Sequence, residues 1–195
     1  MKSHFEMMAS YNTWANALLF KMSEALTDEQ YRRDVGSYFK SLHGTLNHLL
    51  VTNRIWMRRL SGQGDHPSTL DTIAFQDLAS LKLARISEDV RISEFVWNLE
   101  ESDMERVWEY QTLKGFRMSQ PIKEILAHLF NHQTHHRGQA HGILTAVGVV
   151  EPDSLDLVFM QRLKRESVDA SAQQGVQATV ANVRSWPIPL KNSVF

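Results

Sequence analysis

The sequence predicts an all-α protein, a four-helix bundle with short extra elements and a C-terminal extension. Four long segments repeat apolar residues at three- and four-residue spacing, which is the period of helices that bury one face. Most connections between these segments are short, which favours packing of the helices into one bundle. The chain has 195 residues, 43% of them hydrophobic, and this suffices to bury the core of one domain.

The first two helices are predicted at about residues 3–25 and 39–60. A polar break at Thr27-Asp28 follows the first helix. The second helix ends at Ser61-Gly62-Gln63-Gly64, because glycine is typical of the residue that follows a helix. The long connection over residues 60–75 leaves the topology of the bundle open.

A third helix is predicted at about residues 75–99, and the hydrophobic period then changes. Val107–Tyr110 and Phe116–Met118 flank Lys114-Gly115, a pattern typical of a short β-hairpin. Ser119-Gln120-Pro121 resembles the entry to the next helix, since proline is favoured in the first helical turn.

The fourth helix is predicted at about residues 122–146, and a further short segment at about 155–163. We expect a bundle domain over residues 1–165 and a C-terminal extension over 166–195. Much of the extension is rich in Ala, Ser, Gln and Val, which is typical of a linker or a loosely packed segment. Trp186–Leu190 is too apolar for a solvent spacer, so we expect it to dock on the same chain or on a partner subunit.

The composition excludes several kinds of site. The chain contains no cysteine, which rules out disulfides, thiolate zinc sites, cysteine-ligated iron–sulfur clusters and a cysteine nucleophile. Any metal must therefore be held by imidazole and oxygen ligands. The 21 Lys and Arg against 22 Asp and Glu give no general electrostatic footprint for nucleic acid or anionic lipid, so neither is expected as a partner.

The hydropathy pattern predicts neither a membrane span nor a signal peptide. No segment approaches the ~18 consecutive apolar residues that a transmembrane helix needs. Polar residues interrupt any apolar region behind Lys2, unlike the core of a signal peptide. We therefore expect a soluble, cytoplasmic protein.

A cluster of histidines on the fourth helix is the strongest candidate site. His128 and His132 are four residues apart, as are His132 and His136, so spacing alone leaves both pairs open as metal ligands. At about 100° per residue, His132 and His136 lie nearest the apolar stripe of the helix, with His128 and His135 on its flank. A metal in the bundle core would therefore take His132 and His136.

The alternative interpretation is that this cluster forms the polar flank of an amphipathic helix. Imidazoles buried without partners are costly, so a core-facing pair needs a ligand or hydrogen bonds. His48 on the second helix would be the third ligand if it faces the pair, although a lone histidine beside an apolar face is more often a hydrogen-bonded core residue. The other histidines are weaker candidates because of their positions: His4, His43, His66 and His141.

Signatures of other site classes are absent from the sequence. The Glu-x-x-His pairs of di-iron carboxylate bundles do not occur. His-Glu-x-x-His, a glycine-rich phosphate loop and Gly-x-Ser-x-Gly are also missing.

Three stretches carry motifs in a characteristic order. Tyr11–Asn16 reads Tyr-Asn-Thr-Trp-Ala-Asn, Thr45–Leu50 reads Thr-Leu-Asn-His-Leu-Leu, and Asn131–Gln139 reads Asn-His-Gln-Thr-His-His-Arg-Gly-Gln. Their order and spacing resemble the YNxWAN, TLxHLLxxxxxW and NHxxxHRGQ motifs of the DinB/YfiT-like family. The resemblance spans most of residues 5–160.

This resemblance implies a four-helix bundle in which three histidines bind a divalent metal ion, often within a dimer. The resemblance implies His48, His132 and His136 as the metal ligands, and the helical wheel agrees for His132 and His136. His135 stands at a variable position and is not carried over as a ligand. Asn53 stands where relatives often have an acidic residue, so no acid–base role is assigned to it.

The resemblance also implies a function. Relatives in the wider superfamily include thiol-dependent transferases and isomerases, so we expect a metal-dependent enzyme, either a thiol S-transferase or a hydrolase, that acts on a small molecule. Three imidazoles leave one coordination position open for water or substrate, and Zn, Ni and Fe all accept such ligands. Because the chain has no cysteine, any attacking sulfur must arrive as a low-molecular-weight thiol.

The alternative is a non-catalytic stress-response protein that binds a metal or another ligand. A cavity beside an open metal site favours the enzyme, whereas a closed or dry site favours the binding protein. Gln139, Asn47 and Asn131 are candidates to orient the ligands, with helix packing as the more frequent role of such residues. A homodimer is expected from the resemblance.

Overall fold

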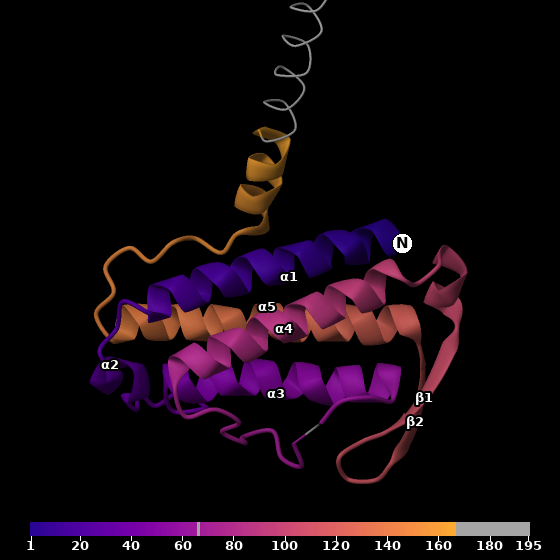
Figure 1. The fold of residues 1–195 in the computed structure, drawn as a ribbon, viewed down its shortest axis with the longest axis horizontal. Helices are drawn as coiled ribbons and strands as arrows, with labels where there is room; N and C mark the ends of the chain where they lie inside the picture. Colours follow the sequence, from indigo (N-terminus) through magenta and orange to yellow (C-terminus); the bar gives the residue numbers. More distant parts are fainter. Residues whose placement is uncertain (66, 167–195) are drawn as a thin grey trace, which may run out of the picture. The chain divides into compact units, whose positions relative to one another are not determined.

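The computed structural model of the chain confirms the all-α class, and it describes residues 1–65 and 67–166. Four long helices form the bundle (Figure 1), and each of α1 and α3 packs against both α4 and α5. The bounds of these helices are Lys2–Ser23 for α1, Leu42–Ser61 for α3, Leu78–Trp97 for α4 and Ile122–Ala146 for α5.

Capping residues define where two of these helices begin. Ser41 accepts a hydrogen bond from the backbone N–H of Gly44 and caps α3, and Asp77 caps α4 in the same way through Ser80. The predicted starts at Phe39 and Phe75 were therefore about three residues early, because apolar residues that precede a cap were counted as part of the helix. The predicted end of α3 is confirmed, since Gly62 closes it with a left-handed φ of 71°.

Two short helices were not predicted from the sequence. Thr27-Asp28, interpreted as a polar break, begins the helix α2 over Asp28–Arg32. Thr27 and Gln30 form a reciprocal capping box there, so the same polar residues that end one helix start the next. A 3₁₀ helix, η1, covers Glu101–Glu105 between α4 and the hairpin.

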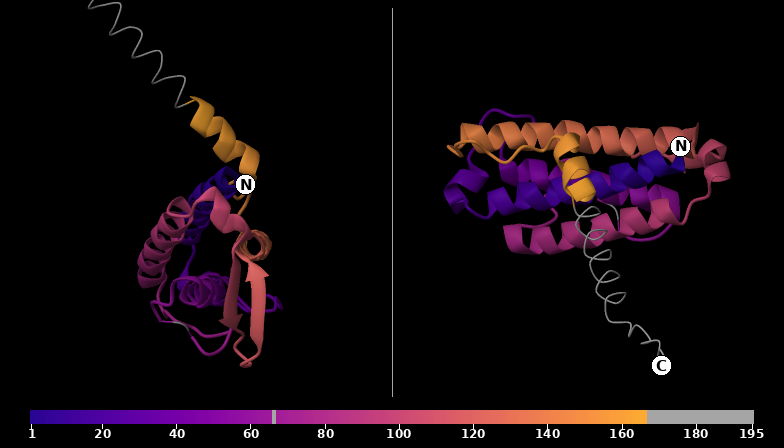
Figure 2. Two further views of the ribbon diagram at one scale, coloured as in Figure 1. Left: turned by 90° about the vertical axis from the view of Figure 1, so that its right-hand side faces the viewer. Right: turned by 90° about the horizontal axis from the view of Figure 1, so that it is seen from above.

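The predicted β-hairpin is confirmed. β1, Val107–Gln111, pairs in antiparallel register with β2, Arg117–Pro121, such that Val107 lies opposite Pro121. The views in Figure 2 show the two strands running side by side near one end of the bundle. Residues 119–121 belong to β2, which leads directly into α5, so they form a strand end as well as the helix entry that was predicted.

The described residues from Asp156 onward belong to a second unit, separate from the unit Met1–Leu155. Its described part contains a helical segment over residues 157–166, where the sequence predicts a short segment at 155–163. Trp186–Leu190 and the rest of the extension lie outside the described residues, and the domain boundary at 165 stays a prediction. Within the described part of the chain, no helix is long and apolar enough to cross a membrane.

The core of the bundle consists of two apolar clusters, one centred on residues such as Met57 and Phe130 and the other on residues such as Leu46 and Leu144. On each long helix a group of buried polar residues lies between the positions that contribute to the two clusters. We call this group the polar layer; its members are Asn12, Asn16, Asn53, Arg85, Asp89, Gln133 and Arg137.

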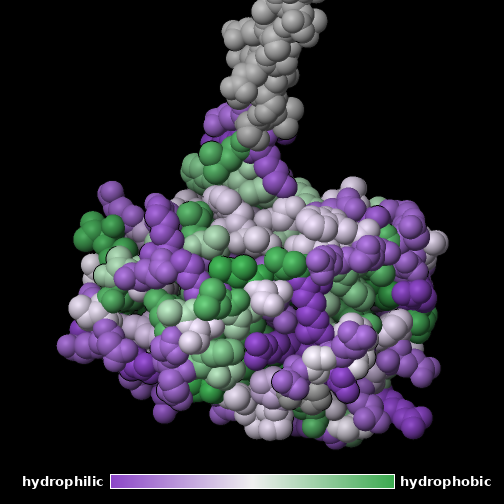
Figure 3. Space-filling model, viewed as in Figure 1, coloured by the Kyte–Doolittle hydropathy of each residue, from purple (hydrophilic) through white to green (hydrophobic). Residues whose placement is uncertain are grey.

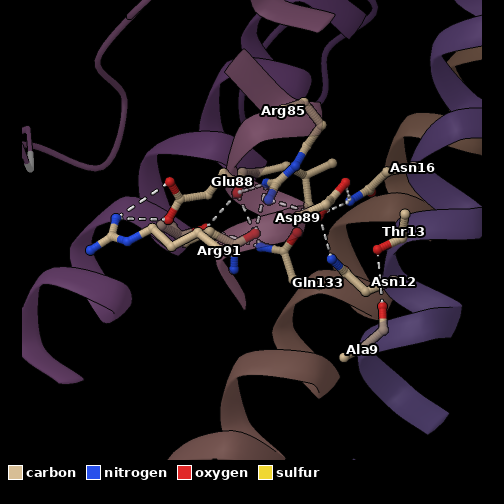
Figure 4. Close-up of polar contacts among 12 residues, drawn as sticks. Ala9, Asn12, Thr13, Asn16, Arg85, Glu88, Asp89, Arg91 and Gln133 are labelled. Carbon is tan, nitrogen blue, oxygen red and sulfur yellow. Dashed lines mark hydrogen bonds and ion pairs between the residues drawn. The ribbon is translucent and has the colours of Figure 1, made fainter. Parts of the chain in front are cut away.

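Asp89 is the centre of the polar layer (Figure 4). Its carboxylate accepts hydrogen bonds from Asn12 Nδ2 at 2.7 Å and Asn16 Nδ2 at 3.1 Å, and pairs with Arg85 Nη2 at 2.8 Å. Arg137 on α5 donates to the Asn12 side-chain oxygen. These contacts join α1, α4 and α5. A buried charge without partners is very costly, so the buried carboxylate needs the hydrogen bonds and the ion pair that surround it.

Two further contacts connect the polar layer to α3. Arg85 Nη1 donates to Asn53 Oδ1 at 2.7 Å, and Gln133 Nε2 donates to the Leu49 carbonyl at 3.1 Å. All four long helices therefore take part in one buried hydrogen-bonded group.

Asp89→Asn is expected to destabilise the bundle strongly, because it leaves the buried guanidinium groups of Arg85 and Arg137 without an anion. Loss of one partner from a buried ion pair costs about 3–5 kcal/mol. The measurement is the free energy of unfolding in urea. The control is Glu29→Gln, which removes an exposed pair with Arg33 and should cost less than about 1 kcal/mol. Equal effects of the two variants would contradict the role given to the polar layer.

Candidate metal centre

Three histidines from two helices meet at the α3–α5 contact. His136 Nε2 lies 3.2 Å from His48 Nε2 and 3.1 Å from His132 Nε2. One ring nitrogen of each of the three residues lies within 4.8 Å of the others. The structure thus brings together the three residues that were selected from the sequence, as a group able to hold a metal ion.

The outer ring nitrogens show which tautomer each of two imidazoles adopts. His48 Nδ1 lies 2.8 Å from the Leu70 carbonyl, which only accepts hydrogen bonds, so Nδ1 carries the proton. His136 Nδ1 donates in the same way to Gln139 Oε1 at 2.7 Å. The facing Nε2 atoms of His48 and His136 therefore present lone pairs to each other. Two facing lone pairs of this kind suit coordination of a cation between them.

Burial keeps the histidines in the form that binds metals. It lowers the pKa of His132 to about 3 and that of His48 to about 4, and the neighbouring histidines act in the same direction. Burial also lowers the pKa of His136. These shifts favour uncharged imidazoles at neutral pH, and the uncharged ring is the form that coordinates a metal.

A tight loop before α3 places an aromatic ring on this group. The Phe39 ring stacks on the His48 ring with centroids 3.8 Å apart and meets the His136 ring edge-on at 5.6 Å. Lys40 next to it has a positive φ of 67°, which turns the chain into the helix. A side chain at Gly44 would meet the Phe39 carbonyl oxygen at 2.1 Å, so only glycine lets the loop approach this closely.

A cavity of about 630 Å³ lies next to the histidine group. Phe39, which stacks on His48, and Leu70, whose carbonyl orients His48, both line it. The wall also carries Tyr38, Lys40 and Asp71. None of the three histidines lines this cavity, so Phe39 and Leu70 are its connection to His48. Its lining residues include two aromatic residues, one lysine and one aspartate.

The remaining histidines lie outside the group. His128 contacts the Trp56 ring at 5.1 Å, and His135 accepts a hydrogen bond from Gln139 Nε2 at 3.2 Å. His43 is held by the Phe75 carbonyl at 3.0 Å, and His141 by the Asp153 carbonyl at 3.1 Å. His66 lies outside the described residues.

Three polar residues were candidates to orient the ligands, and the structure separates them. Gln139 contacts His136 directly. The Asn47 side chain instead donates to the Phe75 carbonyl and accepts from the Phe75 N–H, so it fixes the backbone before α4 and does not orient a histidine. Asn131 is exposed.

The sequence did not indicate the roles of Phe39 and Leu70. Phe39 was assigned to the helix itself, and Leu70 acts through a backbone carbonyl that no side-chain pattern reveals.

The fold and the histidine group together define a helical-bundle protein with a candidate three-histidine metal centre. The model of the DinB family matches residues 1–174, and the chain belongs to this family, which confirms the resemblance. Protein DinB of Bacillus subtilis (strain 168) is 26% identical over 142 residues, which cover 71% of this chain and 83% of that protein.

Two solved structures share the fold. A DinB-like protein from Bacillus cereus ATCC 10987 has a TM-score of 0.58 at 19% identity and covers 74% of this chain and 91% of its own. A DinB-like protein from Bacillus subtilis has a TM-score of 0.55 at 13% identity, with 76% and 97% covered. At these identities the likeness concerns the fold alone, so the chemistry of the site is argued from the residues of this chain.

The metal-free protein is expected to lose stability as the pH falls below about 6.5, the ordinary pKa of a histidine. The folded-state pKa of His48 is about 4, so between these values the unfolded chain binds the additional proton and is favoured. Urea unfolding in the presence of a chelator at several pH values measures this dependence. His48→Gln should reduce the slope, whereas His4→Gln, at an exposed position far from the group, should leave it unchanged. The prediction fails if both variants retain the wild-type slope.

Proposed function

We propose that the chain binds one divalent metal ion through His48, His132 and His136 and acts with it as an enzyme on a small molecule. The observation that carries the proposal is the convergence of three ring nitrogens, two of which, those of His48 and His136, direct lone pairs at each other. Ligand nitrogens about 2.0–2.1 Å from a tetrahedral zinc ion lie roughly 3.3 Å apart. The two closest nitrogen pairs, at 3.1 and 3.2 Å, match this spacing.

The residues around the ligands support catalysis by such a centre. Gln139 and the Leu70 carbonyl hold the rings of His136 and His48 through their outer nitrogens, which is the usual way in which a metal site keeps its ligands oriented. Zn, Ni and Fe accept a set of three imidazoles. A metal ion held here supplies a Lewis acid that activates a bound water or thiol.

The reaction class we favour is thiol-dependent S-transfer, with hydrolysis as the second possibility. The chain has no cysteine, so the sulfur comes from a low-molecular-weight thiol. The cavity beside His48 has room for such a cosubstrate, and Lys40 and Asp71 on its wall suit a ligand that carries charged groups.

The competing function is a non-catalytic protein that binds a metal or another ligand in a stress response. It would need no room for a substrate beside the metal. The cavity of about 630 Å³ next to the histidines favours the enzyme.

Purified protein is expected to contain about one divalent ion per chain, and His136→Ala should lose it because two imidazoles are too few for a stable site. Metal analysis by mass spectrometry measures the occupancy. His135→Ala is the matched control, since it changes the adjacent histidine outside the group and should retain the ion. Unchanged metal content in His136→Ala would refute the assignment.

Metal-loaded protein, incubated with an aryl halide electrophile and a panel of small thiols, is expected to form thioether conjugates. In this reaction the thiol sulfur displaces the halide and the thiol proton goes to solvent. Chromatography with mass detection quantifies the product. Removal of the metal and His136→Ala should both abolish it, while His135→Ala should not. Metal binding without any conjugate across the panel would support the non-catalytic alternative.

We also propose that the protein forms a homodimer through α4. Four large apolar side chains on this helix are exposed: Leu83 by 70%, Ile86 by 51%, Val90 by 51% and Trp97 by 54%. Their spacing of three, four and seven residues is that of a helix that packs against a copy of itself. Figure 3 shows hydrophobic atoms gathered in the middle of the face on which α4 lies.

Val90→Glu is expected to convert the dimer to a monomer, because it places a charge in the centre of this apolar surface. Light scattering coupled to size-exclusion chromatography measures the mass. Glu94→Gln, one turn along the same helix, is the control and should remain dimeric. A monomeric wild-type protein at micromolar concentration would exclude this interface.

A further inference from the structure

A second cavity, of about 260 Å³, lies near the end of α3 and is lined on its other side by the hairpin. It is separate from the cavity beside the histidines. The polar residues that line it are two arginines, a serine, a threonine and a glutamine, and no acidic residue is among its lining residues. These residues are Arg58, Arg59, Ser68, Gln111 and Thr112.

Arg59 is the central group of this cavity. Its guanidinium lies over the Trp56 ring at 4.5 Å and the Tyr110 ring at 5.2 Å. Among the described residues no carboxylate pairs with Arg59, which is half-buried. Several other arginines of the bundle do have such partners: Arg32, Arg33, Arg85, Arg91 and Arg106. The positive charge of Arg59 thus remains available to a ligand.

The surroundings of Arg59 hold it in place. Trp108 Nε1 donates to the Arg59 carbonyl at 2.9 Å, and the Tyr110 hydroxyl donates to Gln120 Oε1 at 2.6 Å. The ring that covers the guanidinium is therefore fixed by the strand pair, and the strand pair is fixed to α3. Arg58 donates one N–H to the Gly62 carbonyl, which leaves its other N–H groups for the cavity. A site ordered before binding loses less entropy when the ligand enters.

We propose that this cavity binds an anionic group of a small molecule, a carboxylate, phosphate or sulfonate. The planar fork of a guanidinium donates two parallel hydrogen bonds to such oxyanions, and hydroxyl and amide groups complete their coordination. The cavity is smaller than the roughly 300–1,000 Å³ of sites that enclose a whole ligand. It therefore accommodates the charged end of a molecule.

This site is independent of the metal centre. His48 and Arg59 lie on the same face of α3 but about three helical turns apart. No contact of Arg59 involves His48, His132 or His136 in the described structure. We therefore expect anion binding in metal-free protein as well as in the metal-loaded form.

Titration of the full-length protein with inorganic phosphate tests the proposal, with tryptophan fluorescence as the readout because Trp56 and Trp108 both contact Arg59. Saturable binding is expected, and calorimetry checks the affinity. Arg59→Gln should weaken binding at least about tenfold, since a lost charge-assisted contact is worth about 1.5–3 kcal/mol. Arg59→Lys should give an intermediate loss, because it keeps the charge without the fork.

Arg54→Gln is the matched control. It lies on the same helix, and its guanidinium also covers an aromatic ring, that of Phe75 at 5.3 Å, yet it does not line the cavity. It should bind phosphate as the wild type does. If Arg59→Gln fails to fold, Thr112→Val and Arg58→Gln provide the same test from the other walls of the cavity.

Two results would overturn the proposal: absence of saturable phosphate binding to the wild type, or equal affinity in Arg59→Gln and Arg54→Gln. The second result would make Arg59 a clamp between α3 and the hairpin. His136→Ala separates this proposal from the metal centre, because it should lose the metal and keep phosphate affinity.

Discussion

The buried carboxylate of Asp89 is the interaction on which the arrangement of the helices depends. A charge in the interior of a bundle must be surrounded by donors, and here they come from Asn12, Asn16 and Arg85. A slip of one helix along its axis would break these contacts, because each depends on the distance between two particular side chains. Apolar side chains alone tolerate small slips between helices, whereas directional hydrogen bonds around a buried charge do not.

This alignment also positions the candidate metal centre. On α5, Gln133 follows His132 and Arg137 follows His136, so the ligands and the polar layer alternate along the same turns of one helix. Gln133 donates to the carbonyl of Leu49, the residue after His48. The polar layer therefore holds α3 and α5 in the alignment in which the three imidazoles meet.

Several features of this protein could be read from the sequence because they depend on local periodicity. Helical spacing selected His132 and His136, and the glycine pair around residue 62 marked the end of α3. The hairpin followed from the change of period around Gly115. The sequence was less informative where a role depends on surroundings. Phe39 looked like a helix residue, although the cap at Ser41 places it in a loop that contacts the candidate metal centre.

The amino-acid sequence by itself determines which segments form the long helices and which of their faces are apolar. It also determines that the chain offers imidazole side chains, and no thiol, as metal ligands. Tertiary structure alone decided that His48 faces the α5 pair and that the Leu70 carbonyl selects its tautomer. It also decided that Arg59 lines a cavity and pairs with no carboxylate in the described part of the chain. The physical reason is the separation along the chain between the residues that interact in each case. Periodicity and capping act within a few residues of the chain. The protonation of an imidazole or the pairing of a guanidinium depends instead on groups that only the folded bundle brings within a few ångströms.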